Sequence, residues 1–160
     1  MIAAGGTAGH VVPAIAIADA LRADGADVLF AGGKRAEAEL VPAAGYPFAA
    51  IRVEGISRTN PLRAARAIVR AAGAVREAGR ILDRHRADAV LGGGGYVAGP
   101  VGLAAVRRRI PLVLSEADSH LGLTNRLLAP RARRARRDRG GPRRAAPCTG
   151  RPRGPRSPPR

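Results

Sequence analysis

Two glycine-rich stretches hold residue types that bind anions and move protons. They are residues 5–10 (GGTAGH) and residues 92–96 (GGGGY). Glycine lets backbone N–H groups approach a ligand closely, and a helix that begins behind such a loop adds partial positive charge. Imidazole titrates near neutral pH, so His10 is a candidate general base. These patterns predict a phosphate or diphosphate site beside a histidine.

Blander interpretations of the same residues remain open. The glycines could serve only to make tight turns, and His10 could only cap the start of a helix. Two glycine loops at equivalent positions nevertheless favour anion binding. A third segment, residues 115–118 (SEAD), follows another apolar run and adds two carboxylates to the candidate site.

Strand and helix patterns alternate along the first 130 residues. Such repetition predicts an α/β fold, with a Rossmann-like parallel sheet covered by helices on both faces. In such sheets, ligands bind beyond the carboxyl ends of the strands, where all three loops fall. The expected strands are 1–4, 26–32, 47–55, 87–95 and 111–116. The expected helices are 11–23, 36–45, 61–82, 97–108 and 121–129. Pro13 should lie in the first turn of the first helix, and Pro42 should break the second.

Composition divides the chain into a domain, residues 1–130, and a basic tail, residues 131–160. The tail holds twelve arginines and one aspartate, a net charge of +11, and no Val, Ile, Leu or Phe. Because it cannot bury enough apolar surface to fold, we expect the tail to be disordered. It is either a basic arm that binds nucleic acid or anionic lipid or, as the composition favours, the product of a GC-rich gene read out of frame.

Several protein classes fit the sequence poorly. No apolar run reaches the length of a membrane-spanning helix, and the N-terminus does not resemble a signal peptide. The single cysteine, Cys148, excludes an internal disulfide framework. The first loop lacks the dinucleotide spacing G-x-G-x-x-G, and residues 32–35 (GGKR) supply no acid at the end of the second strand. A nucleotide-dependent oxidoreductase is therefore a weak alternative, and we expect no cofactor and no metal.

Four segments resemble the bacterial N-acetylglucosaminyltransferases that form lipid II in peptidoglycan synthesis, glycosyltransferase family 28. They appear in the family's order and are GGTAGHVVPAIAIADAL, LVPAAGYPFAAIRVEGISR, GGGGYVAGPVGLAA and IPLVLSEADSHLGLTNRLLAPRAR. The resemblance runs from residue 2 to about residue 134. It implies the N-terminal, acceptor-side half of a GT-B fold.

The resemblance also implies a reaction and its partners. Such enzymes transfer N-acetylglucosamine from UDP-N-acetylglucosamine to lipid I, with inversion, at the cytoplasmic face of the cell membrane. The C-terminal domain carries most of the nucleotide-sugar site, so we expect weak donor binding and doubtful activity from this chain alone. No specific nucleic-acid partner is implied, although a nucleic-acid-binding protein using the tail remains the alternative from another class.

Residue roles follow from the family motifs. The resemblance implies catalytic roles for His10, as acceptor base, and Glu116. It implies substrate contacts for the other matched positions: Thr7, Ala8, Gly9, Gly94, Gly95, Tyr96, Asp118 and Asn125. Ala8 replaces a usual glycine, and Asp118 stands where the family commonly has asparagine.

The expected helix 61–82 has one apolar and one basic face. At 100° per residue, Val75 and Leu82 share a face with Ala78, and Arg80 lies opposite them. Such a helix usually packs on a sheet. Its basic face, with residues 107–109 (RRR), also suits an anionic membrane surface.

Overall fold

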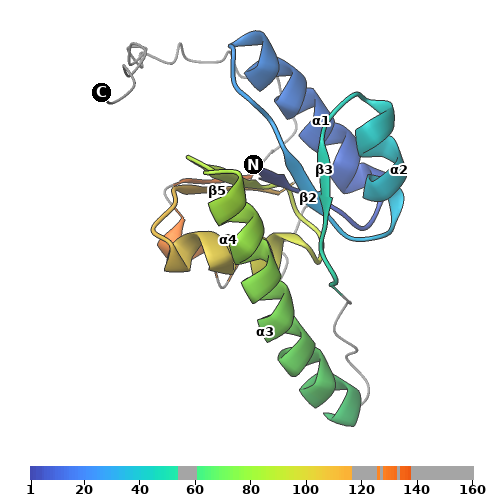
Figure 1. Ribbon diagram of the computed structural model, residues 1–160, viewed down its shortest axis with the longest axis vertical. Coiled ribbons are helices and arrows are strands. Elements are labelled where there is room, and N and C mark those ends of the chain that lie inside the picture. Colours follow the sequence, from blue (N-terminus) through green and yellow to red (C-terminus); the bar gives the residue numbers. More distant parts are fainter. Residues whose placement is uncertain (54–60, 117–125, 127, 133, 138–160) are drawn as a thin grey trace.

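The computed structural model describes all residues except 54–60, 117–125, 127, 133 and 138–160 (Figure 1). The predicted helix 121–129 therefore lies mostly outside the described residues. The elements, in chain order, are β1 (Ile2–Ala3), α1 (Ala8–Ala23), β2 (Phe30–Gly32), α2 (Ala36–Ala43), β3 (Phe48–Ala50), α3 (Pro61–Arg84), β4 (Val90–Gly92), α4 (Ala98–Arg107), β5 (Leu112–Glu116), a 3-10 turn η1 (Ala129–Arg131) and β6 (Arg134–Arg137).

The strands form one parallel sheet in the order β3-β2-β1-β4-β5-β6. Strand β1 pairs with β2 on one side and with β4 on the other, through Ile2↔Leu91 and Ala3↔Gly92. The strand order reverses between β1 and β4, which is where doubly wound sheets bind their ligands. The predicted Rossmann-like sheet is confirmed.

Helices cover both faces of the sheet (Figure 1). Successive strand residues point to opposite faces. Ile2 and Phe30 accordingly pack with α1 and α2, whereas their neighbours Ala3 and Ala31 pack with α3 and α4. Small side chains dominate both cores, and the predicted apolar face of α3 is buried at Val75, Ala78 and Leu82.

Helix α1 begins at Ala8, three residues before the predicted start. The prediction that Pro13 lies in the first turn is therefore wrong, because Pro13 is the sixth residue of the helix. A proline there cannot donate to the carbonyl group of Gly9, four residues earlier. His10 consequently lies inside the first helical turn, and Thr7 occupies the N-cap position.

The sheet continues beyond the expected end of the domain at residue 130. Strand β6 pairs with β5 from Val113↔Arg134 to Glu116↔Arg137. The structure thus differs from the predicted tail at residues 134–137. Residues 138–160, the rest of that tail, lie outside the described residues.

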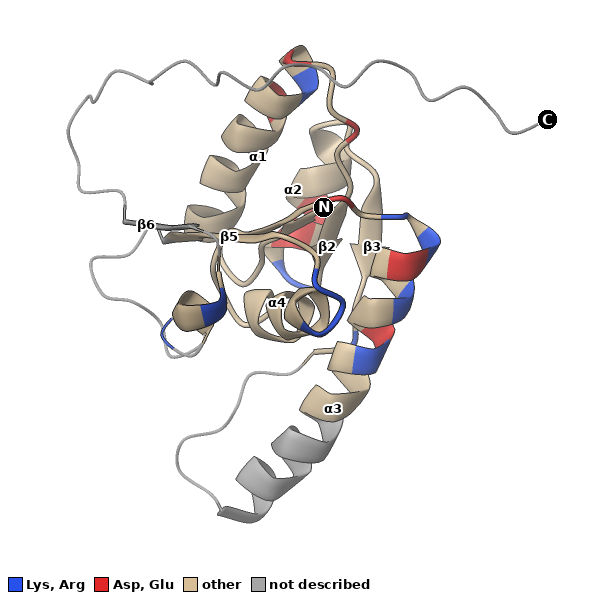
Figure 2. Ribbon diagram, turned by 90° about the vertical axis from the view of Figure 1, so that its left-hand side faces the viewer, with Lys and Arg blue, Asp and Glu red and all other residues tan. Residues whose placement is uncertain are grey.

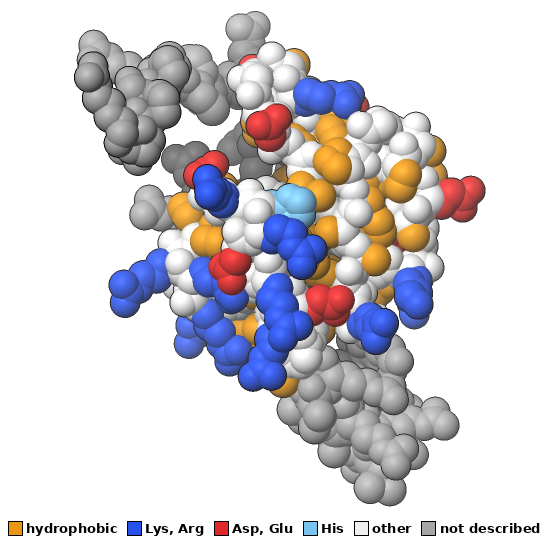
Figure 3. All heavy atoms as spheres, in the orientation of Figure 1, with side chains coloured by type: hydrophobic (Ala, Val, Ile, Leu, Met, Phe, Trp, Pro, Cys, Tyr) orange, Lys and Arg blue, Asp and Glu red, His pale blue; other side chains and the backbone are white. Residues whose placement is uncertain are grey.

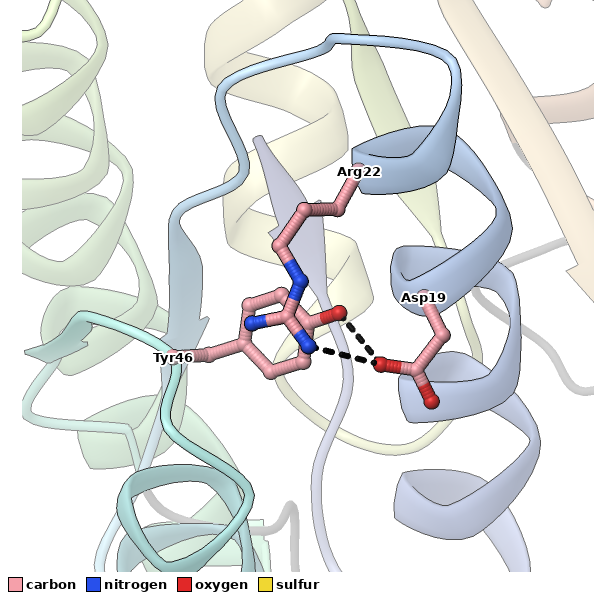
Figure 4. A network of polar contacts seen from close by, with 3 residues as sticks. All are labelled: Asp19, Arg22 and Tyr46. Atoms are coloured by element: carbon pink, nitrogen blue, oxygen red, sulfur yellow. Dashed lines mark hydrogen bonds and ion pairs between the residues drawn. The ribbon is translucent and has the colours of Figure 1, made fainter.

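A polar network joins α1 to the segment between α2 and β3 (Figure 4). The Tyr46 hydroxyl donates to Asp19 Oδ1 at 2.6 Å, and Arg22 Nη2 donates to the same oxygen at 3.2 Å. The Arg22 guanidinium also lies 4.3 Å from the Tyr46 ring centroid, and that ring packs against Phe30. The network closes the end of the α1–α2 layer away from the glycine loops.

Helices α3 and α4 are joined on the opposite face by a two-pronged ion pair. Arg108 donates from Nε to Asp83 Oδ1 at 2.7 Å and from Nη2 to Asp83 Oδ2 at 2.8 Å. Gly79 leaves room for the Arg108 guanidinium, since a Cβ there would collide with it. Arg108 is therefore committed to α3, and of the expected basic triplet Arg107 and Arg109 remain as further exposed cations. Figure 2 shows that basic residues lie along α3 and in the turn that follows α4. None of the helices within the described ranges is long and apolar enough to cross a membrane.

Candidate functional site

The two glycine loops emerge side by side at the carboxyl edge of the sheet. Residues 4–7 follow β1 and residues 93–97 follow β4, and these strands are neighbours. The backbone of Gly93 donates to the carbonyl group of Ala3, which extends the strand pairing into the loops. The predicted convergence of these loops at one edge is thus present in the fold.

The contact between the loops is backbone on backbone. A Cβ on Gly95 would collide with the carbonyl oxygen of Gly5, and Gly95 has a φ of 77°. A Cβ on Gly94 would lie 2.9 Å from His10 Nδ1, an atom that is buried. Glycine is required here for both close approach and backbone conformation. Gly94 and Gly95 therefore fix the place of His10 and of the first loop.

The outer part of the first loop faces solvent. Thr7, Ala8 and Gly9 are exposed, and His10 is half-buried. Thr7, Ala8 and Gly9 lie at the beginning of α1, where backbone N–H groups have no partner within the helix and the helix end is partially positive. A Cβ on Gly9 would meet only Thr7 Oγ1, at 3.6 Å. The exposed start of α1 therefore carries the backbone donors and the partial positive charge on which the predicted anion site depends.

A buried carboxylate that sequence reasoning missed lies beneath these loops. Glu37 of α2 is 0% exposed. Its Oε2 accepts from the Gly6 N–H at 2.9 Å, and its Oε1 accepts from the Gly33 N–H at 2.8 Å and from the Tyr96 hydroxyl at 2.9 Å. One side chain therefore ties together the loops after β1, β2 and β4.

The electrostatics of this contact favour the ionised form of Glu37. Burial by itself would raise the pKa of the carboxyl, but hydrogen bonds from the backbone of Gly6, from the backbone of Glu37 itself, from the Tyr96 hydroxyl and from the Gly33 backbone outweigh burial and leave the pKa below its ordinary value. Burial and the bond to Glu37 raise the pKa of the Tyr96 hydroxyl, which therefore stays protonated as a donor.

The sequence contains one indication that Glu37 is buried, namely its spacing from Val41. Both lie on one face of α2, four residues apart, and both are fully buried. Unless the buried face of the helix is known, the segment AEAELVPA does not show which of Glu37 and Glu39 is buried.

Other predicted site residues are placed only in part. Glu116 is the last residue of β5, at the same carboxyl edge of the sheet. Asp118 and Asn125 lie outside the described residues. Within the described ranges, no three His, Cys, Asp or Glu side chains gather as a metal site would require.

The geometry agrees with the comparisons to known proteins. The profile of the glycosyltransferase family 28 N-terminal domain matches residues 1–136. The chain belongs to that family. Its fold superimposes on the crystal structure of MurG from Acinetobacter baumannii with a TM-score of 0.76 and 35% identity, over 86% of this chain and 40% of that one. The glycosyltransferase SsfS6 of Streptomyces sp. SF2575 shares the fold at 24% identity, with a TM-score of 0.53, over 71% of this chain and 38% of that one.

Curated relatives of this family 28 domain carry one long enzyme name. A protein of Acidithiobacillus ferrooxidans is 50% identical over 135 residues, and one of Aeromonas hydrophila is 45% identical over the same length. Each is named UDP-N-acetylglucosamine–N-acetylmuramyl-(pentapeptide) pyrophosphoryl-undecaprenol N-acetylglucosamine transferase. The matches cover 84% of this chain but only 38% and 37% of those relatives, so the chain spans about two fifths of their length.

Proposed function

We propose that this chain is the acceptor-side domain of an inverting N-acetylglucosaminyltransferase. The enzyme transfers N-acetylglucosamine from UDP-N-acetylglucosamine to lipid I and so forms lipid II for peptidoglycan. The observation that carries the proposal is the meeting of the two glycine loops at the strand-order reversal, in a domain of family 28. The names of the relatives supply the donor and the lipid-linked acceptor.

In this proposal the exposed start of α1 faces the diphosphate-bearing substrates. Thr7, Ala8 and Gly9 offer backbone N–H groups to a phosphate, and His10 accepts the proton of the acceptor hydroxyl. Tyr96, Gly94 and Gly95 line the acceptor side. Glu116, Asp118 and Asn125 complete the site from the segment that begins at the end of β5.

An oxidoreductase function fits the structure less well. Dinucleotide-binding domains present an acid near the end of the second strand to a ribose hydroxyl. Glu37, the first acid after β2, has both carboxylate oxygens engaged inside the protein. Since it faces the loops and not solvent, it does not serve as that ribose ligand.

The proposal includes attachment to the cytoplasmic face of the membrane, where a lipid-linked acceptor lies. Lys and Arg side chains gather on the face shown in Figure 3, mainly in its lower half. Exposed arginines include Arg76, Arg80 and Arg84 of α3, Arg107 at the end of α4 and Arg109 just after it. Each basic side chain near an anionic lipid surface contributes about 1 kcal/mol of attraction.

A chimera tests the proposed reaction. Residues 1–136 of this chain replace the matching segment of the Acidithiobacillus ferrooxidans relative, and transfer from UDP-N-acetylglucosamine to a soluble lipid I analogue is measured. We expect transfer by the chimera and none by the 160-residue chain alone, which brings only the acceptor half of the cleft. A folded chimera without transfer would contradict the proposal.

Replacing His10 by alanine in the chimera separates the roles open to this residue. As a general base, His10 contributes to the chemical step, so kcat should fall about 100-fold while KM changes little. The matched control is His85→Ala, an exposed histidine at the end of α3, which should leave both constants unchanged. A fall in melting temperature with normal kcat would instead assign His10 a structural role at the start of α1.

A further inference from the structure

Glu37 has no part in the chemistry proposed above. It is the one charged side chain that is buried within the described part of the chain. A buried ionised group is costly unless hydrogen bonds compensate it. Here the three partners from other residues are uncharged donors, and they come from three different loops. Because Glu37 joins three loops, its burial has a consequence for the site as well as for α2.

Only an ionised glutamate satisfies this set of donors. Both carboxylate oxygens accept, and neither has a hydrogen to donate. A glutamine would turn its NH₂ group toward either the Gly6 N–H or the Gly33 N–H, so that two donors face each other. An aspartate is one methylene shorter and cannot reach all three groups from the same position on α2.

The glycines around Glu37 are shaped to this contact. A Cβ on Gly5 would lie 2.8 Å from Glu37 Oε1, and a Cβ on Gly32 would lie 2.6 Å from Glu37 Cγ. A Cβ on Gly33 would collide with the Tyr96 hydroxyl. Three glycines, at or just after the ends of β1 and β2, therefore leave the space in which Glu37 meets Tyr96.

Tyr96 is held at a second point on its ring. The Arg35 guanidinium carbon lies 5.1 Å from the ring centroid, within the range of a cation–π contact. The ring also lies over Gly6, whose added Cβ would be 3.6 Å from Tyr96 Cδ1. Glu37 and Arg35 both belong to the segment from the end of β2 into α2. This segment therefore contacts Tyr96 at its hydroxyl and at the face of its ring.

We propose that Glu37 is a positioning residue that fixes Tyr96 and the first glycine loop relative to each other. It orients the Tyr96 ring at the acceptor side of the site and holds the Gly6 N–H away from the ligand. The N–H groups of residues 7–9, at the exposed start of α1, then remain for the phosphate. The part of this proposal that concerns the substrate rests on the proposed function.

Tyrosine NMR reads the contact in the 160-residue chain without any substrate. The chain has two tyrosines and no tryptophan, so ring-¹³C labelling gives two Cζ signals that Tyr46→Phe and Tyr96→Phe assign. In Glu37→Gln we expect the Tyr96 signal to move and the Tyr46 signal, which reports the Asp19 contact, to stay. An unmoved Tyr96 signal in folded Glu37→Gln would overturn the proposal.

A second measurement decides the matter if Glu37→Gln does not fold. Tyr96→Phe removes one donor and keeps both backbone donors, so it should fold. With glutamate side-chain carboxyls labelled, its Glu37 signal should shift from the wild-type position, while that of Glu77, which accepts from the Arg52 N–H, should not. An unchanged Glu37 signal would overturn the proposal.

A double-mutant cycle in the chimera tests the effect on the substrate. Because Glu37 acts through Tyr96, Glu37→Gln and Tyr96→Phe should each lower kcat/KM by about tenfold or more, and the double variant should lose no more than the worse single variant. Losses that multiply would contradict positioning through Tyr96. An inactive parent chimera would overturn the proposed function and the substrate part of this inference, while the tyrosine signals would still decide the contact.

Discussion

Gly9→Val in the chimera is expected to lower sugar transfer by about 100-fold or more while the domain stays folded. Gly9 is exposed in the first turn of α1, where backbone N–H groups face the proposed phosphate site. A branched side chain there keeps the phosphate away from the backbone, and losing a single well-placed donor in an active site typically costs 100-fold or more in rate. Steady-state kinetics with the lipid I analogue measure the effect.

The structure makes this substitution specific to ligand binding. A Cβ on Gly9 would meet only Thr7 Oγ1, at an ordinary contact distance of 3.6 Å, so the fold tolerates it. Gly73→Val is the matched control, because Gly73 is also an exposed helical glycine, in α3, with open space around it. Full activity of Gly9→Val would show that the loop does not hold a phosphate.

Gly95→Ala is expected to cause the largest loss of stability, about 3 kcal/mol or roughly 10 °C in melting temperature. Two causes add. The φ of 77° strains any residue with a Cβ, and the Cβ would also collide with the Gly5 carbonyl oxygen, a backbone atom that cannot rotate away. The loops after β1 and β4 would have to separate at the site.

Gly45→Ala separates these two causes in thermal denaturation. Gly45 has a nearly identical φ of 76° after the end of α2, but nothing lies within 4 Å of its added Cβ. It should therefore lose only the conformational part, about 1 kcal/mol or a few degrees. Equal losses at Gly45 and Gly95 would show that the close contact with Gly5 does not hold the two loops together.

Local patterns in the sequence were sufficient for the architecture and for the edge of the sheet that carries the site. Apolar runs of strand type alternate with helical patterns, and each glycine loop sits between a strand and a helix. Since these signals are local, they predicted the parallel α/β fold and the convergence of residues 5–10 with residues 92–96. The boundaries were less accurate. Strand β2 begins at Phe30 and not at residue 26, and α1 begins at Ala8.

Only the tertiary structure decided which groups touch within that edge. Glu37 and Glu39 lie in one short helix, and it is packing against the sheet that buries the first and exposes the second. Two of the donors to Glu37, the Gly6 N–H and the Tyr96 hydroxyl, lie 31 and 59 positions away, so no local pattern indicates them. Strand β6 has the sequence RARR, which lacks the apolar pattern of a strand. It still pairs with β5, because the pairing uses backbone groups that every residue has. The sequence by itself thus determined the elements and the edge where they place the site. The long-range contacts of Glu37, Gly5 and Gly95 determined its shape, because burial and close approach depend on the whole fold.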